Sequence, residues 1–468
     1  MNHAETKSVL GTVSRRNFLK STALAGAGFV LAPTILGAEE NKADKELNIG
    51  FIGVGTEGQI LLQNALKIPG LKFTAVCDIW PYNQGRAVRL LKKYKHEAKG
   101  YADYQEMLDT EKTLDGVLIA TPDWVHAPIT IAALKAGKHV YCEKEMSNSL
   151  EMAKAMVVAA KETKRLLQIG HQRRSNPRYH AALDLATKKN CCGNITYVEA
   201  QWNRAKRLDV GWPKDSDLDE ATLKKYGYDT MAKFRNWRWY KKFAGGPIAD
   251  LGSHQIDIFN WFLGASPRAV MADGGVDNYE GIEWYDNISA IYEWNVARAG
   301  KTRVVRGFYK VLSTSSNGGY AETFLGDEGS LIISENDKQG GIRREQEAPL
   351  ADWEKEMAKA APAPAEAPKK EETPKKEETP KKEADADVEV KAHTGFSPGR
   401  YYPAITVPGF TKSEHLPHIE NFVAALRTGS PLSCPGEVGY DTCVSVLRVN
   451  EAVEAQKRIE FKPEEFKA

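Results

Sequence analysis

The sequence is poor in cysteine and has almost no net charge. Its 6 cysteines include no C-x-x-C pair and no Cys/His cluster at zinc spacing, which argues against both a metal site and a redox dithiol. We expect buried free thiols, with a long-range disulfide as the alternative in an oxidising compartment. Lys and Arg number 64 against 62 Asp and Glu, for a formal net charge of +2, so no nucleic-acid partner is expected.

The apolar stretch near the N-terminus, from Ser21 to about Ile35, is shorter than the roughly 20 residues that a membrane span needs. It follows the segment Ser14–Lys20, which reads S-R-R-N-F-L-K, and this order is typical of a twin-arginine signal. We therefore expect residues 1–38 to be that signal, the twin-arginine export machinery to be a partner, and the protein to be periplasmic or otherwise exported. Cleavage is expected near Ala38, with an uncleaved anchor as the alternative.

The apolar pattern divides the remaining chain into two domains. Residues 45–170 alternate short apolar runs with helical periods, which predicts an α/β Rossmann domain with strands at Leu47–Val54, Phe73–Cys77, Gly116–Ala120, His139–Cys142 and Leu166–Gly170. Residues 171–440 are predicted to form an α+β domain on a large, mostly antiparallel sheet, with strands such as Thr196–Trp202, Ile288–Trp294, Arg303–Val311 and Phe324–Ile333. Residues 441–468 are expected to form a C-terminal helix and tail, the helix returning to pack on one of the two domains.

An insertion interrupts the second domain. Between about Glu345 and His393 the composition collapses into Ala, Pro, Glu and Lys, with a tandem K-K-E-E-T-P repeat from Lys369. Such a segment has too little apolar surface to offset the entropy of ordering it. Residues 345–393 are therefore predicted to be a disordered, solvated tether without chemistry of its own.

The strongest local motif is Gly53-Val54-Gly55-Thr56-Glu57-Gly58, which follows the first predicted strand and opens a predicted helix. The first glycine permits a tight turn, the second lets a pyrophosphate approach the backbone, and the third lets helix and strand pack closely. Asp78 ends the next strand, where a carboxylate accepts hydrogen bonds from the adenosine ribose. NAD is preferred because Asp78 would repel a 2′-phosphate, and Arg86 on the following helix keeps NADP open as the alternative.

Two more loops follow predicted strands and should face a cofactor: Ala120–His126 and Cys142–Glu145. Together with the glycine motif, Gly245-Gly246, the run Asp250–His254 and Asn421, they make the sequence resemble the glucose-fructose oxidoreductase and inositol dehydrogenase (Gfo/Idh/MocA) family. The resemblance covers nearly everything from residue 47 to 460 except the insertion. It implies a two-domain oxidoreductase whose cofactor-binding residues are Gly53, Gly55, Thr56, Gly58, Asp78, Thr121, Pro122, His126, Glu143 and Lys144.

The resemblance also implies catalytic roles. Lys144 matches a lysine that meets the substrate beside the nicotinamide, although Glu145 replaces the proline of the family's Glu-Lys-Pro motif and leaves the geometry of the loop open. Asp250 and His254 are four residues apart, so on a helix they share one face, with Asp257 at the next turn. By resemblance, His254 takes a proton from a substrate hydroxyl, Asp250 orients the substrate or the imidazole, and Lys144 stabilises the developing alkoxide.

Substrate contacts are expected from Gln172, Arg173, Asp250 and His254, although surface arginines are an equal alternative for the arginines of this junction. The aromatic cluster Phe234, Trp237, Trp239 and Tyr240 is compatible with stacking on a sugar ring or with ordinary packing between domain and loop. No metal site is expected.

The predicted function is an exported NAD(P)-dependent oxidoreductase that acts on a CH–OH group of a sugar, polyol or glycoside and assembles as a homo-oligomer. Because free NAD is scarce outside the cytoplasm, we expect the nucleotide to stay bound through turnover. One alternative is an NAD-dependent glycoside hydrolase that works by transient oxidation and elimination. The other is a non-catalytic sugar-binding protein that keeps the nucleotide as a structural element.

Overall fold

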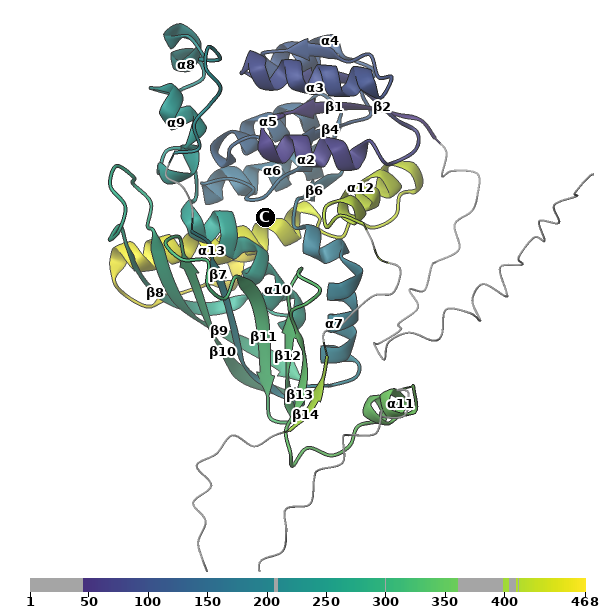
Figure 1. Ribbon diagram of the computed structural model, residues 1–468, viewed down its shortest axis with the longest axis vertical. Coiled ribbons are helices and arrows are strands. Elements are labelled where there is room, and N and C mark those ends of the chain that lie inside the picture. Colours follow the sequence, from purple (N-terminus) through teal and green to yellow (C-terminus); the bar gives the residue numbers. More distant parts are fainter. Residues whose placement is uncertain (1–44, 206–208, 299, 361–398, 404–409, 411) are drawn as a thin grey trace, which may run out of the picture.

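The structure is a computed structural model that describes residues 45–468 except 206–208, 299, 361–398, 404–409 and 411. Two sheets lie end to end, with the parallel sheet above the larger second sheet in Figure 1 and helix α13 running between them. The predicted signal, residues 1–38, lies outside the described residues. Within the described part of the chain, no helix is both long and apolar enough to cross a membrane.

The N-terminal sheet has six parallel strands in the order β3-β2-β1-β4-β5-β6, as in a Rossmann fold. All five predicted strands are present, with ends within 2 residues of the prediction. The sixth, β3, was not predicted, because its sequence Lys-Gly-Tyr contains no apolar run. The strands are β1 (Leu47–Ile52), β2 (Leu71–Cys77), β3 (Lys99–Tyr101), β4 (Gly116–Ile119), β5 (His139–Cys142) and β6 (Leu167–Ile169). The helices between them are α2 (Thr56–Ala65), α3 (Pro81–Lys93), α4 (Tyr104–Thr110), α5 (Asp123–Lys135) and α6 (Leu150–Thr163).

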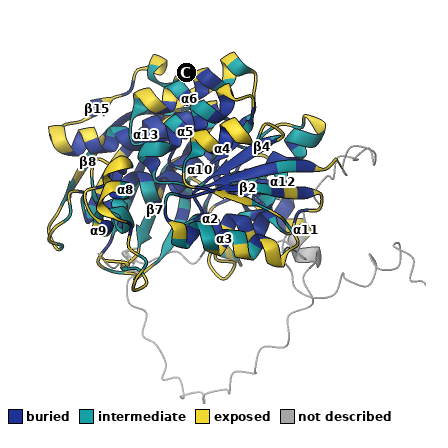
Figure 2. Ribbon diagram, turned by 90° about the horizontal axis from the view of Figure 1, so that it is seen from above, coloured by how far each residue is buried: buried dark blue, intermediate teal, exposed yellow. Residues whose placement is uncertain are grey.

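Helices cover both faces of the parallel sheet, which explains why its strands read as continuous apolar runs. All four residues of β4 are buried. One face packs against α2, α3 and the late helix α12 (Leu416–Thr428), and the other against α4, α5 and α6. Seen from above in Figure 2, the centre of the molecule is buried and the exposed residues lie on outer helical turns and loops.

The second sheet has nine strands in the order β14-β13-β12-β11-β7-β10-β9-β8-β15, and every neighbouring pair except β7 and β10 is antiparallel. This confirms the predicted mostly antiparallel sheet. Its strands are β7 (Ile195–Asn203), β8 (Pro267–Gly275), β9 (Asn287–Arg298), β10 (Lys301–Leu312), β11 (Tyr320–Gly326), β12 (Gly329–Ile333), β13 (Gly341–Arg344), β14 (Arg400–Tyr402) and β15 (Ile459–Glu460). The helices of this part are α7 (Pro177–Thr187), α8 (Glu220–Lys225), α9 (Met231–Arg235), α10 (Ser253–Leu263), α11 (Asp352–Ala360) and α13 (Gly436–Ala455).

Two predictions for this part need correction. The single strand predicted over Phe324–Ile333 is a hairpin of β11 and β12, because Asp327 and Glu328 turn the chain between two glycines. The start of the predicted disordered insertion 345–393 is ordered as far as α11, because Trp353 is buried and the buried Glu354 pairs with Arg344 and Arg400. The tandem repeat itself lies outside the described residues.

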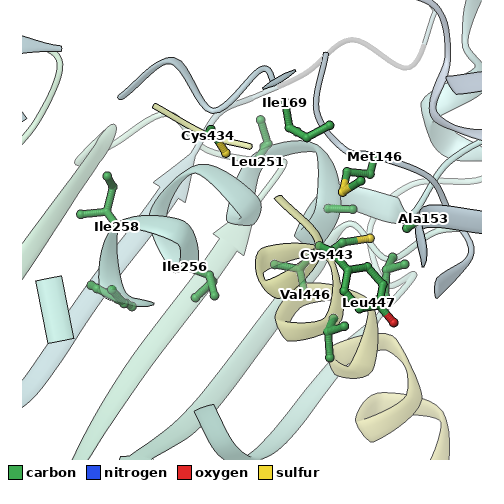
Figure 3. Packing of buried hydrophobic residues seen from close by; sticks show 14 of the residues in the cluster. Met146, Ala153, Ile169, Leu251, Ile256, Ile258, Cys434, Cys443, Val446 and Leu447 are labelled. Carbon is green, nitrogen blue, oxygen red and sulfur yellow. The ribbon is translucent and has the colours of Figure 1, made fainter. Parts of the chain in front are cut away.

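The C-terminal helices join the two domains, although only one domain was expected to receive them. Helix α13 packs on β8 of the second sheet and on α6 of the Rossmann domain. Figure 3 shows Cys443, Val446 and Leu447 of α13 among buried side chains from both domains, including Met146 and Leu251. All 6 cysteines are buried and free, as expected. One continuous core therefore fixes how the loops of one domain face the other.

A candidate active site between the two sheets

A cleft of about 700 Å³ opens at the carboxyl ends of β1, β2, β4 and β5, which is where open α/β sheets bind ligands. The second sheet and the start of α12 form its opposite wall. The Rossmann domain contributes Gly53, Gly55, Thr56, Asp78, Thr121, Pro122, Glu143 and Lys144. The rest of the chain contributes, among others, Gln172, Trp202, Arg238, Asp250, His254, Tyr320, Glu335, Glu414 and His415.

The glycine motif forms an anion cradle at the start of α2. Gly53 adopts φ +82°, and a Cβ on Gly58 would lie 2.1 Å from the carbonyl oxygen of Gly53, so both positions require glycine. Gly55 differs, because a Cβ there would meet its nearest neighbour, Asn83 Nδ2, at 3.8 Å. The N-terminus of α2 has no side-chain cap, so its N–H groups face this space. The cradle therefore fits the pyrophosphate of a dinucleotide.

Asp78 lies at the end of β2 beside the cradle. Its carboxylate accepts hydrogen bonds from the backbone N–H groups of Val54 (2.9 Å) and Trp80 (2.8 Å), which fix its position. Burial raises its pKa to about 6 against these hydrogen bonds. The carboxylate lines the cleft where the expected adenosine ribose would lie.

Not every predicted cofactor residue lines the cleft. Gly58 packs against Gly53 behind the cradle. His126 is 1% exposed, and its Nδ1 lies 2.7 Å from the carbonyl oxygen of Glu145. Burial lowers the pKa of His126 to about 4, so the ring is neutral and its place is to support the loop that carries Lys144.

The loop after β5 brings Lys144 into the cleft. The peptide bond between Lys144 and Glu145 is cis. Lys144 Nζ donates to the backbone carbonyl of Asp250 at 2.6 Å and lies 3.7 Å from the Asp250 carboxylate. Before it, Glu143 accepts from the Tyr141 hydroxyl at 3.0 Å, and burial, with the charge of Glu57, raises its pKa to about 8. One carboxylate oxygen each of Glu57 and Glu143 and one ring nitrogen of His415 lie within 4.8 Å of one another at this wall.

Glu145, which stands where the family motif has proline, is fully buried. Its carboxylate accepts from the backbone N–H of Met146 at 2.8 Å, and burial raises its pKa to about 8. Between pH 4.5 and 8 this group is therefore protonated in the native state and ionised in the unfolded state. The native state is then favoured at low pH, and its stability falls as the pH rises through this window.

We expect Glu145→Gln to flatten that dependence. The melting temperature of the nucleotide-free protein should fall by several degrees between pH 5 and pH 9, and the fall should be smaller in the variant because glutamine cannot ionise. Burial also raises the pKa of Glu143, so part of the fall in melting temperature with pH will remain in the variant. Glu162→Gln, on the exposed face of α6, is the control and should leave the slope as it is. Parallel curves for wild type and Glu145→Gln would contradict this assignment.

Asp250 reaches the cleft from an irregular turn rather than from a regular helix, whereas His254 lies in the first turn of α10. Residues Ile248–Gly252 form a π-helical turn, and α10 begins at Ser253. Such turns shift the side chains that follow them and are frequent at functional sites. The Asp250 carboxylate also accepts a hydrogen bond from Arg238 Nε at 3.1 Å, so Arg238 and Lys144 both neutralise its charge.

His254 is held in its neutral form. Burial, then the charges of Lys144 and Arg173, lower its pKa well below 6.5. Its ring packs at 5.5 Å from Trp202, and its Nδ1 is buried without a hydrogen-bond partner among the described residues. The site therefore pairs a neutral imidazole with a cationic amine in one cleft.

The structure separates the residues of the junction after β6 into two groups. Gln172 lines the cleft. Arg173 is 1% exposed and pairs with Glu322 and Glu335 behind the wall, so it is neither a surface arginine nor a direct lining residue. Arg174 is also no surface arginine, because its Nε donates to both carboxylate oxygens of Asp257, at 2.8 and 2.9 Å.

The aromatic cluster of the second domain packs over the adenosine end of the cleft. The segment 209–243, here called the aromatic cap, joins Trp80 of the Rossmann domain in one core through side chains such as Leu223, Tyr228 and Met231. Trp80 Nε1 donates to Ser216 O at 2.5 Å, and the Tyr226 hydroxyl donates to Ala102 O at 3.0 Å. Of the four predicted aromatics, Phe234 and Trp237 line the cleft, which suits stacking on a ligand, whereas Trp239 is buried and neither it nor Tyr240 is among the lining residues, which suits packing.

Comparison with known proteins agrees with this geometry. A model described as an oxidoreductase family with an NAD-binding Rossmann fold matches residues 47–171, and the C-terminal α/β domain of the same family matches residues 217–461. An inositol 2-dehydrogenase of Salmonella typhimurium is 36% identical over 135 residues, which cover 28% of this chain and 39% of that protein. A glycosyl hydrolase family 109 protein of Parabacteroides distasonis is 34% identical over 157 residues, 30% of this chain and 34% of that protein.

Solved structures show the same fold. Levoglucosan dehydrogenase in complex with NADH superposes with a TM-score of 0.63 over 89% of this chain and all of its own, at 17% identity. At that identity the likeness concerns the fold alone.

Proposed function

The chain belongs to the Gfo/Idh/MocA family of oxidoreductases, and we propose that it oxidises a CH–OH group of a sugar, polyol or glycoside outside the cytoplasm. The observation that carries this proposal is the approach of Lys144 and His254 to one cleft that also holds the glycine cradle. Lys144 contacts Asp250, which lies one helical turn before His254 in the chain, so the amine and the imidazole line the same part of the cleft wall. The curated relatives named above align over less than half their length, so the substrate is inferred from the site.

The residues of the chain divide the work of proton transfer. When bound, NAD supplies the acceptor for the hydride that leaves the substrate carbon. His254, neutral at neutral pH, takes the hydroxyl proton, and Lys144 stabilises the negative charge that develops on the oxygen. The backbone carbonyl and carboxylate of Asp250 hold Lys144 in place, and Arg238 holds Asp250.

We further propose that the nucleotide stays bound through turnover. The aromatic cap covers the adenosine end of the cleft and is tied to the Rossmann domain by Trp80 and Tyr226. Opening this core to release the nucleotide would expose its buried side chains, Trp80, Tyr228 and Phe243 among them, to water. Retention would suit an enzyme that is exported, as the N-terminal pattern predicts, to a compartment where free NAD is scarce.

Two other functions use the same cleft. The likeness to a glycosyl hydrolase family 109 protein favours an NAD-dependent glycoside hydrolase without net redox change as the second candidate. The third is a carbohydrate-binding protein that keeps the nucleotide as a structural element. We also propose self-association through the outer face of the nine-stranded sheet, where the paired residues Met271 and Ile291 are 48% and 41% exposed. A monomer in sedimentation experiments would contradict that.

One preparation tests the proposal. The full chain is expressed, the exported fraction is isolated, and nucleotide is extracted and identified by mass spectrometry. We expect close to one NAD per chain, and a change in nicotinamide absorbance when the matching sugar is added. Protein that stays inside the cell contradicts export, and exported protein that is empty and exchanges NAD freely contradicts retention. Release of an aryl alcohol from an aryl glycoside without net NADH would favour the hydrolase, and binding without turnover would favour the binding protein.

A further inference from the structure

The cleft has a second end, away from the ribose site. Asp78 lies at the end of β2, near one edge of the parallel sheet, whereas Gln172 follows β6 at the opposite edge. Around Gln172 the wall is completed by side chains from three other segments. We call this group the distal subsite; it comprises Gln172, Trp202, Tyr320, Glu335 and Glu414.

The distal subsite carries more negative than positive charge. Arg173 is the buried cation behind it and is shared by Glu322 and Glu335, whose side chains are 0% and 4% exposed. Arg173 is thus paired with two carboxylates, and the third carboxylate of this wall, Glu414, has no ion-pair partner among the described residues. Glu335 and Glu414 both line this end of the cleft. Arg204, another cation of the cleft wall, is exposed to solvent.

The polar atoms of the distal subsite are mostly hydrogen-bond acceptors. Gln172 is 6% exposed, and its Oε1 has no hydrogen-bond partner among the described residues. Its amide nitrogen is already directed to Glu335 Oε1, at 3.4 Å. Trp202 and Tyr320, stacked at 4.4 Å with an interplanar angle of 21°, form the apolar side. A ligand here must therefore bring the donors, and an amide oxygen buried without a partner indicates that one is missing.

We propose that the distal subsite selects carbohydrates that present hydroxyl or ammonium groups and excludes those that present a carboxylate or a phosphate. Hydroxyl groups donate to Glu335, Glu414 and Gln172, and an ammonium group adds charge attraction. An anionic group in the same place meets two carboxylates with one shared cation behind them. The inference rests on the proposed function, because it assigns a substrate class to the same cleft.

The test uses three probes that share one ring: glucose, glucosamine and glucuronate. Their binding to the full chain loaded with NADH is measured by nicotinamide fluorescence, which does not depend on turnover. We expect glucuronate to bind on the order of tenfold more weakly than glucose, and glucosamine at least as tightly as glucose. Equal binding of glucuronate and glucose, or no binding of any probe by NADH-loaded protein, overturns the proposal.

Two variants assign the selectivity to Glu414. Glu414→Gln keeps the shape and should bring the glucuronate to glucose ratio close to one, whereas Glu414→Lys should favour glucuronate. A residue that only supports the fold would not invert the order. Unchanged ratios in both variants overturn the proposal, and Glu162→Gln should bind all probes as wild type does. If the probes bind in the expected order but no hydride is transferred, the proposed function fails and the distal subsite stands.

Discussion

Replacing Lys144 by methionine should lower kcat/KM by about 10²–10³-fold, because the cation that stabilises the substrate oxygen is lost. Methionine keeps the length and most of the volume of the side chain. Bound nucleotide should stay near the wild-type amount, since the glycine cradle and Asp78 are untouched. His254→Asn should cost about 10²–10⁴-fold through loss of the proton acceptor. Steady-state kinetics and extracted nucleotide measure the two effects separately.

The double variant distinguishes a shared task from two independent ones. If Lys144 and His254 act on one oxygen, kcat/KM of the double variant should be only slightly lower than that of the less active single variant. Lys135→Met, at the exposed end of α5, is the matched control and should keep full activity. Activity within a few fold of wild type in Lys144→Met would remove this lysine from the mechanism. Strictly multiplicative losses in the double variant would contradict the shared oxygen.

Alanine at Gly58 should prevent the Rossmann domain from folding normally. Its Cβ would lie 2.1 Å from the carbonyl oxygen of Gly53, a backbone atom that cannot move without displacing β1 from α2. We expect a large fall in the melting temperature and little soluble protein. Thermal unfolding of the nucleotide-free protein measures this directly.

Alanine at Gly55 is the informative partner of that variant. The free protein has room for its Cβ, with Asn83 Nδ2 at 3.8 Å, so stability without nucleotide should be close to wild type. The same methyl group would occupy the space in which a pyrophosphate approaches the backbone, so NAD should bind at least tenfold more weakly. Wild-type affinity for NAD in Gly55→Ala would show that the anion lies elsewhere. Normal stability in Gly58→Ala would contradict the geometry of the cradle.

Features that lie within one short segment could be read from the chain alone. The strand, the glycine loop and the helix that follows occupy Leu47–Ala65, and their chemistry depends on hydrophobic period and on glycines a few residues apart. The five predicted parallel strands were found for the same reason, whereas β3 contains no apolar run. The hairpin of β11 and β12 was missed because its turn, Asp327-Glu328, is so short that the apolar residues on either side of it were taken for one strand. The ordered start of the insertion was missed because its contacts are with Arg344 and Arg400, which lie outside the insertion.

The composition of the cleft depended on contacts between distant parts of the chain. Lys144 meets Asp250 across 106 residues and Arg173 meets Glu322 across 149, and no local pattern marks either partner. Arg238, Glu335 and Glu414 were missed on that account, although Glu414 directly precedes a histidine that also lines the cleft. Glycine spacing and apolar period act through neighbours in the chain, so they fixed the domain type and the nucleotide cradle. Charge balance in the cleft acts through space, and only the packing of α13 between the two sheets decided which carboxylates, arginines and aromatic rings face the substrate.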